Sequence, residues 1–193
     1  MIIFCNYHIG KGMNIINVKS SNNWQDIKDA AMNTIGKKNG KYPSKEWKKN
    51  IIMAEHSPIR KLKISWRWVD LPYWVSTHFV RHKFGIEHFV STQRTDRVGT
   101  DRKNKTQDAL VTHECEANAQ ALINISRKRL CTCASTETRE AWKSLKDHIE
   151  EIEPELASCM VKECVYRGFC PEINGCGYTN TKNYKEERAK YIE

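Results

Sequence analysis

The sequence predicts an α+β protein that is mostly helical, because one clear strand stands among at least five helical segments. In residues 61–69 apolar Leu62, Ile64, Trp66 and Trp68 alternate with Lys61, Lys63, Ser65 and Arg67. This alternation is typical of a half-buried strand. With 193 residues, 39% hydrophobic and 28% charged, the chain 1–193 is expected to form a single globular domain.

Two helices are expected before the strand. Residues 23–35 place Trp24, Ile27, Ala31 and Ile35 on one stripe, after a cap at Asn22 or Asn23. A lysine-rich loop then runs from Gly36 to Pro43, and Ser44 can cap a second helix that ends near Ala54.

Downstream of the strand, Asp70 is expected to cap a helix that has Pro72 in its first turn and runs to about Lys83. The remaining expected segments are a polar loop over 94–106, helices over 107–129 and 135–152 (starting at Ser135 or Thr136), a last helix from Pro154 to about Tyr166 ended by Gly168, and a polar tail over 178–193.

No membrane segment or secretion signal is expected. The sequence has no apolar run near the ~20 residues needed to span a bilayer. The apolar start, residues 1–6, is short and lacks a preceding basic region, so we do not interpret it as a signal peptide. The expected location is the cytoplasm, or the host cytoplasm if the protein is viral.

The net charge of +9 favours anionic partners. One alternative is a non-enzymatic nucleic-acid-binding protein that uses the lysine loop 37–49, the Arg-rich segment 94–105 and six tryptophans as stacking platforms. Two observations weigh against it. Many of the lysines are typical of solvated faces, and Trp66 and Trp68 share a strand face that favours core packing.

Eight cysteines without a secretion signal are expected to be reduced thiols. Cys159, Cys164, Cys170 and Cys176 are separated by four, five and five residues, wider than the two-residue hooks of most structural zinc sites. Cys131 and Cys133 could form half of a metal site, but nothing near them in the sequence completes it. Buried or incidental thiols are therefore expected, with a metal or redox role as the alternative.

The most informative segment begins with Arg81, His82 and Lys83 and reaches Ser91 after seven further residues. It combines cations with hydroxyl donors, as an anionic, phosphate-bearing ligand requires. His78 lies four residues before His82, so on a helix the two share a face. Three interpretations compete for this pair: a zinc site, a structural helix end, and a cationic helix end that binds phosphate or an electron-rich ring. The last is favoured, since Phe79 replaces the Glu of a metalloprotease helix and no metal is expected.

This segment resembles the signature of the flavin-dependent thymidylate synthases (the ThyX family), which is Arg-His-Arg, seven residues, then Ser. Two other segments are similar to family motifs. Upstream, residues 54–58 (Ala-Glu-His-Ser-Pro) resemble a Glu-His segment at the usual interval. Downstream, Asn124, Arg129 and residues 134–137 (Ala-Ser-Thr-Glu) resemble a helix with Asn, Arg and then Ala-Gln-Trp-Glu. The resemblance is strongest over 50–170.

The resemblance implies a small antiparallel sheet and a homo-oligomer, normally a tetramer, with active sites at subunit interfaces. It implies reductive methylation of dUMP to dTMP, with methylenetetrahydrofolate as carbon donor, NADPH as reductant and FAD as the bound hydride carrier. The implied site residues are, for FAD, His56, Arg81, His82, Lys83 and Asn124; for the nucleotide, His78, Ser91, Thr92, Gln93, Arg94 and Arg129; and, for stabilising charge on the uracil, Arg129.

Several positions depart from the family pattern. Lys83 replaces an Arg, Phe89 replaces a Glu or Gln, and Gln93 stands where an Arg is usual, with Arg94 one residue later. Ser135 replaces a Gln, and His78 also stands where a Gln is common. Most departures lie on the nucleotide side. They lead to the hypothesis of a divergent member that keeps flavin and acts on another pyrimidine nucleotide or transfers another one-carbon unit, such as hydroxymethyl.

Overall fold

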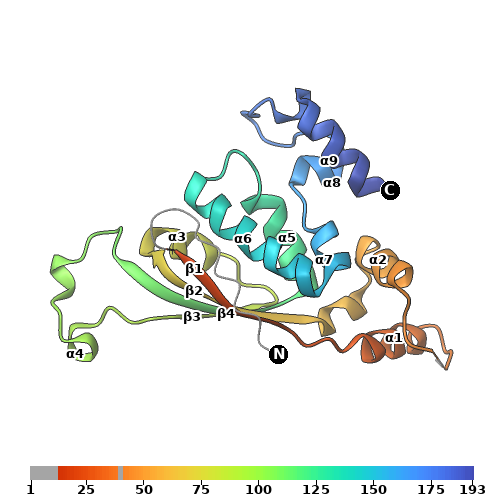
Figure 1. Cartoon of the computed structure of the whole chain (residues 1–193), viewed down its shortest axis with the longest axis horizontal. Helices are drawn as coiled ribbons and strands as arrows, with labels where there is room; N and C mark the ends of the chain where they lie inside the picture. The colour runs from red at the N-terminus through yellow and green to blue at the C-terminus, as the bar shows by residue number, and fades with distance from the viewer. Residues whose placement is uncertain (1–12, 39–40) are drawn as a thin grey trace.

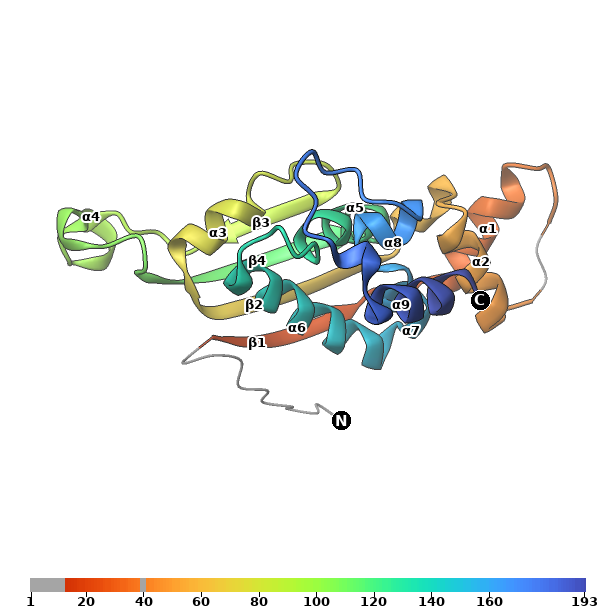
Figure 2. The same cartoon turned by 90° about the horizontal axis from the view of Figure 1, so that it is seen from above.

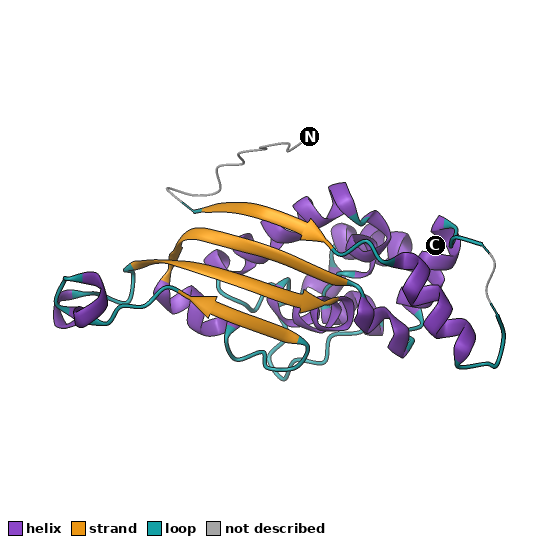
Figure 3. Ribbon diagram, turned by 90° about the horizontal axis from the view of Figure 1, so that it is seen from below, coloured by secondary structure: helices purple, strands orange, loops and turns teal. Residues whose placement is uncertain are grey.

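The computed structural model describes residues 13–38 and 41–193, so the expectation for residues 1–6 lies outside the described residues. A four-stranded antiparallel sheet carries helices on one face, while no described helix covers the other, which we call the open face (Figures 1 and 3). The strands, in spatial order, are β1 Asn14–Ser20, β2 Lys63–Pro72, β4 Leu110–Asn118 and β3 Ile86–Val90. The predicted mostly helical α+β fold with a small antiparallel sheet is confirmed.

The helical elements have the following bounds: α1 Trp24–Asn33, α2 Lys45–Met53, η1 Ser57–Lys61, α3 Tyr73–Phe79, α4 Thr95–Val98, η2 Arg102–Asn104, α5 Ala119–Arg129, α6 Thr136–Ile152, α7 Pro154–Cys159, α8 Glu163–Arg167, η3 Tyr178–Asn180 and α9 Lys182–Ile192. Helices α1 and α2 lie at one end of the molecule, and the excursion that carries α4 projects from the other end (Figure 2). Within the described residues, no helix is both long enough and apolar enough to cross a bilayer.

The core is built on the helix-covered face of the sheet. Trp66 and Trp68 of β2 are buried there and meet edge to face at 5.3 Å between ring centroids. Phe79 of α3 stacks on Trp68 at 4.6 Å, and Trp142 of α6 lies 5.6 Å from Phe79. Aromatic contacts at these distances add to the free energy of burial and have defined geometry. They therefore fix α3 and α6 on the sheet.

The open face of the sheet is polar. Arg67 of β2 forms an ion pair with Glu114 of β4, and Lys63 pairs with Glu116 at 2.7 Å. Phe89 of β3 stands opposite Glu114 and is 62% exposed. The residue that departs from the family pattern at position 89 therefore lies on the open face.

The helix expected over 107–129 is wrong in its first half. Residues 110–118 form β4, which pairs with both β2 and β3. The buried positions of β4 are Val111, His113, Cys115 and Ala117. Only one of these is a strong strand former, so tertiary pairing decides the conformation against a helix-like composition. Asn118 then caps α5 by accepting a hydrogen bond from the backbone N–H of Ala121.

The helix expected over 70–83 is shorter than predicted. Asp70 lies in β2 with φ +57° and caps nothing, and α3 ends at Phe79. The Arg81-His82-Lys83 segment therefore follows the helix instead of belonging to it. A turn hydrogen bond of 2.9 Å from the backbone N–H of His82 to the Phe79 carbonyl keeps His82 close to the helix end.

Three other expectations need smaller corrections. Ile35 lies beyond the end of α1 and is exposed. The helix expected from Pro154 to Tyr166 is broken into α7 and α8. Gly168 ends α8 with φ +83°, as predicted. Much of the polar tail is helix α9, which buries Tyr191. The helices starting after Ser44 and Ser135 are confirmed, with both serines as caps.

Candidate active site

Arg129 joins the end of α5 to the segment after α3. Its Nε donates a 2.9 Å hydrogen bond to Nε2 of His82, and its Nη2 donates a 2.6 Å hydrogen bond to the carbonyl of His78. Three predicted site residues from two distant motifs thus meet at one place. The third guanidinium nitrogen, Nη1, has no hydrogen bond to a described residue.

The hydrogen bond from Arg129 determines which ring nitrogen of neutral His82 carries the proton. Because its Nε2 accepts from Arg129, the ring proton of the neutral form lies on Nδ1. Burial first, then the charge of Arg129 and then His88, lower the pKa of His82 to about 4. The site therefore presents an imidazole N–H beside a fixed guanidinium over the physiological pH range.

His78 is oriented by a short hydroxyl chain from α6. The Ser135 hydroxyl donates to Oγ1 of Thr138 at 2.8 Å, and Oγ1 of Thr138 lies 2.9 Å from Nδ1 of His78. Since Thr138 accepts from Ser135, its own proton is directed to His78, which leaves the Nε2–H of the neutral ring as a donor. Burial, then Arg129 and Arg81, lower the pKa of His78. Ser135, which replaces a Gln of the family pattern, thus acts through Thr138.

A second pair of histidines, His88 of β3 and His113 of β4, lies next to the site on the helix-covered face of the sheet. Nε2 of His88 donates to the carbonyl of His82 at 2.9 Å, so Nδ1 of the neutral His88 ring accepts. Nε2 of His113 lies 3.0 Å from that Nδ1, and Sγ of Cys115 lies 3.4 Å from it. Nδ1 of His113 is buried without a partner. The pair anchors the backbone of His82 to the sheet.

From the lowered pKa values of His82 and His113 we predict that the stability of the fold depends on pH. Burial and His88 lower the pKa of His113 to about 4, and the pKa of His82 is also about 4, against 6.5 for an ordinary His. Between pH 4 and 6.5 the unfolded chain therefore binds more protons, and the free energy of unfolding rises with pH. We expect stability to be complete above pH 6.5 and to fall as the pH drops toward 4. Urea unfolding at several pH values checks this.

The variant His113→Gln is expected to make that slope shallower, because it removes one of the two groups. Equal unfolding free energies at pH 7 and pH 5 for the unaltered protein would contradict the assignment. NMR titration of the histidine ring protons gives the two pKa values directly.

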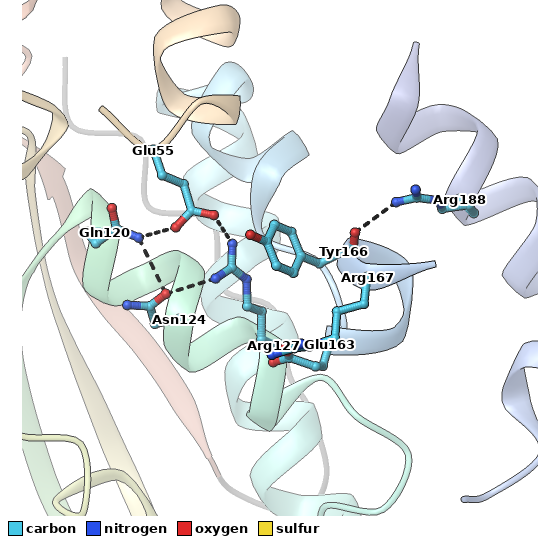
Figure 4. A network of polar contacts seen from close by, with 8 residues as sticks. All are labelled: Glu55, Gln120, Asn124, Arg127, Glu163, Tyr166, Arg167 and Arg188. Carbon is cyan, nitrogen blue, oxygen red and sulfur yellow. Dashed lines mark hydrogen bonds and ion pairs between the residues drawn. The ribbon is translucent and has the colours of Figure 1, made fainter. Parts of the chain in front are cut away.

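The upstream motif belongs to a separate polar network, in which Glu55 contacts residues of α5 (Figure 4). Glu55 makes an ion pair with Arg127 and accepts a 2.5 Å hydrogen bond from Gln120. Oδ1 of Asn124 accepts from Arg127 at 3.2 Å, and the Arg127 guanidinium lies 3.5 Å from the centre of the Tyr166 ring. Both charged side chains of the ion pair are less than a quarter exposed, so the pair is stronger than a surface pair.

Glu55 reaches this position with φ +49°, a conformation that is costly for a residue other than Gly, Asn or Asp. Its neighbour His56 is exposed at the start of η1. The structure therefore places Asn124 and His56 close to one ion-pair network, without a direct contact to the Arg129–His82 cluster.

The predicted phosphate-binding residues lie apart from that cluster, where β3 ends. Ser91 exchanges hydrogen bonds with Thr112: its N–H donates to the Thr112 carbonyl at 2.8 Å, and its Oγ accepts from the Thr112 N–H at 3.0 Å. Arg94 is paired with Asp96 through two hydrogen bonds of 3.0 and 2.7 Å. Oγ1 of Thr92 accepts from the N–H of Arg94, and Nε2 of Gln93 is buried without a partner.

Sequence reasoning missed several residues of these networks. Thr138, His88 and His113 carry no motif of their own, and only the strand register brings His88 opposite Cys115. The structure also bears on the nucleic-acid alternative, because Trp24, Trp66, Trp68 and Trp142 are fully buried and offer no stacking surface.

No family model matches this sequence, and a search of curated proteins also found no match. Among solved structures, the fold is similar to a UMP/dUMP methylase, PolB from Streptomyces cacaoi, in a crystal structure bound with 5-Br dUMP. The TM-score is 0.62 at 11% sequence identity, over 81% of this chain and 95% of that one. At this identity the likeness establishes the shared fold.

Proposed function

We propose that this protein is an enzyme that transfers a one-carbon unit to a pyrimidine nucleotide, dUMP or a close relative. The observation that carries the proposal is the meeting of Arg129 with His82 and His78. These residues come from two motifs 47 residues apart, and both motifs resemble those of flavin-dependent thymidylate synthases. The fold shared with a UMP/dUMP methylase supports the same substrate class.

Arg129 is the residue proposed to act on the uracil. Its Nε and Nη2 are fixed by two hydrogen bonds, and Nη1 remains to donate to a ligand. A guanidinium held in place before the ligand arrives needs no reorganisation when negative charge develops on the ring. His82 and His78 add neutral N–H donors beside it. We infer that this group binds the uracil edge and stabilises its anionic form.

The proposed cofactor is FAD, with NADPH and methylenetetrahydrofolate as co-substrates. The donor set fits a dinucleotide: Arg81, Lys83 and His56 are exposed, and no described residue forms an ion pair with Arg81 or Lys83. The Nδ2 amide of Asn124 remains free to donate, since only its Oδ1 is engaged. Bound flavin would supply the hydride, so no protein nucleophile is required. Arg81 suits a pyrophosphate in bidentate fashion, whereas Lys83 acts as a point charge.

A homo-oligomer, with a tetramer as the expected state, completes the proposal. Within one chain, no hydrogen bond or ion pair of the described residues joins Arg129 or His82 to Ser91, Thr92, Gln93 or Arg94. If these residues bind the nucleotide phosphate, a second copy is the natural source of them. Opening the Arg94–Asp96 pair, which is exposed and therefore weak, would free the guanidinium for a phosphate.

The test is a visible spectrum of the purified protein, followed by tritium release from 5-labelled dUMP and from 5-labelled UMP with methylenetetrahydrofolate and NADPH. A flavin spectrum and release from either nucleotide are expected. Protein that stays colourless with added FAD and releases no tritium overturns the proposal. Flavin binding without release would limit the proposal to another pyrimidine nucleotide or one-carbon unit.

Mixing two inactive variants tests the shared site. Arg129→Gln and Arg94→Gln proteins, each inactive alone, are expected to regain activity when refolded together, because one hybrid site then holds both native residues. Light scattering gives the number of subunits. A monomer that is fully active would contradict this part of the proposal.

A further inference from the structure

Five cysteines gather in the C-terminal part of the molecule. Cys131, Cys164, Cys170 and Cys176 line one small cavity, and they come from the corner between α5 and α6, from α8 and from the segment after α8. Cys133 lies beside this set: the charge of Cys131, then burial and further contacts with Cys131 and Cys176, raise its pKa to about 11. Segments that are far apart in the sequence thus direct thiols to the same place.

Two hydrogen bonds hold the side chain of Cys176. Its sulfur lies 2.6 Å from the hydroxyl of Thr132, and the backbone N–H of Tyr178 donates to the same sulfur. The Tyr178 donor is available because Gly177 adopts φ +78° and turns the chain back over the sulfur. Hydrogen bonds of this kind accompany metal-bound ligands and fix their orientation. Lys162 also lines the cavity, together with Glu163 and Glu172, and its ammonium pairs with Glu187 at 2.7 Å.

The segment that carries two of the thiols is poorly held by the backbone. No backbone–backbone hydrogen bond joins residues 169–176 to another described segment. The hydrophobic cluster beneath them has four buried members, Val161, Cys164, Val165 and Tyr191, and five partly buried ones that include Cys170. Thiols that stay reduced are available to bind a metal instead of forming disulfides.

We propose that Cys131, Cys164, Cys170 and Cys176 bind one zinc ion and that this ion ties the segment 169–176 and α8 to the corner between α5 and α6. Four sulfur ligands suit Zn²⁺, with Zn–S distances of about 2.3 Å and hence sulfur separations of about 3.8 Å. Thiols that are protonated release their protons to solvent on binding. Binding draws residues 169–176 inward without breaking a backbone hydrogen bond to another described segment.

A second group of residues that could bind a metal consists of His88, His113 and Cys115. Their ligand atoms lie within 4.8 Å of one another, and no other group of three such residues in the described ranges is this close. A metal between Nδ1 of His88 and Nε2 of His113 would replace their hydrogen bond. It would also force the His113 proton onto Nδ1, a buried atom without an acceptor. Burial raises the pKa of the Cys115 thiol strongly. We therefore assign this set to hydrogen bonding.

The experiment measures zinc per chain by mass spectrometry in full-length protein purified with a reductant and without chelator. About one zinc per chain is expected in the unaltered protein and far less in Cys176→Ser and Cys170→Ser. Cys159→Ser is the matched control for a buried thiol outside the cavity, and Cys115→Ser tests the second group. Both are expected to keep the zinc. Metal-depleted protein titrated with Co²⁺ is expected to show the absorption of tetrahedral thiolate coordination.

Two results would overturn the proposal. One is zinc-free protein that shows no thiolate absorption with Co²⁺, including protein whose cavity thiols form disulfides in a thiol count. The other is zinc that is lost in Cys115→Ser and kept in both cavity variants. The measurement does not depend on nucleotide turnover, so it is independent of the proposed function. Circular dichroism of each variant distinguishes loss of metal from loss of fold.

Discussion

Replacing Arg129 by glutamine is expected to lower the turnover of the nucleotide about 10²- to 10³-fold, the usual effect of removing one preorganised donor from a developing anion. Two hydrogen bonds fix this guanidinium, to Nε2 of His82 and to the carbonyl of His78. Glutamine keeps one hydrogen-bond donor group but lacks the positive charge and the planar set of N–H donors of the guanidinium. The loss is expected mainly in kcat, since charge develops on the ring during the reaction.

The same variant carries a second readout. The charge of Arg129 is one cause of the low pKa of His82, so Arg129→Gln is expected to raise that pKa toward its ordinary value. NMR titration measures it. Lys128→Gln is the matched control, because Lys128 is an exposed neighbour on the same helix whose charge is not part of the cluster. Unchanged kcat in Arg129→Gln would remove Arg129 from the proposed mechanism.

Replacing Trp68 by alanine is expected to destabilise the fold by about 3–5 kcal/mol, the range for a large aromatic side chain removed from a core. Trp68 is fully buried, stacks on Phe79 at 4.6 Å and lies 6.2 Å from Trp142. Its loss leaves a cavity between the sheet and the two helices that hold the candidate site. Urea denaturation gives the change in unfolding free energy.

Phe84→Ala is the control for Trp68→Ala. Phe84 is also an aromatic residue near the candidate site, but it is 93% exposed. Its replacement is therefore expected to change the unfolding free energy by no more than about 0.5 kcal/mol. Similar losses in the two variants would show that the packing around Trp68 does not determine stability in the way the structure indicates.

The sequence predicts the elements whose pattern is unambiguous. β2 was predictable because large apolar residues alternate with Lys, Ser and Arg over its length. β4 was not, because its buried side includes His113, Cys115 and Ala117, and its exposed Glu114 and Glu116 are typical of helices. Which conformation wins there depends on two neighbouring strands, which are distant in the sequence.

The site was predictable to a similar degree. Motif resemblance predicts that Arg129 and His82 belong to one site. It did not reveal that Ser135 reaches His78 through Thr138, since this chain needs the position of α6 relative to α3. The motif also did not reveal that the residues after β3 lie apart from Arg129. Their position depends on the direction in which residues 91–109 leave the sheet.

The strand order also sets the sequence of events during synthesis. Among the described strands β3 pairs with β4 alone, and β4 lies between β3 and β2 in the sheet. When β3 leaves the ribosome, β4 has not yet emerged, because Leu110 follows Val90 by twenty residues. At about 5–20 residues per second, this delay is roughly one to four seconds. During that time β1 and β2 can already pair, whereas β3 stays exposed to other chains, so the nascent protein is most prone to association just before β4 emerges.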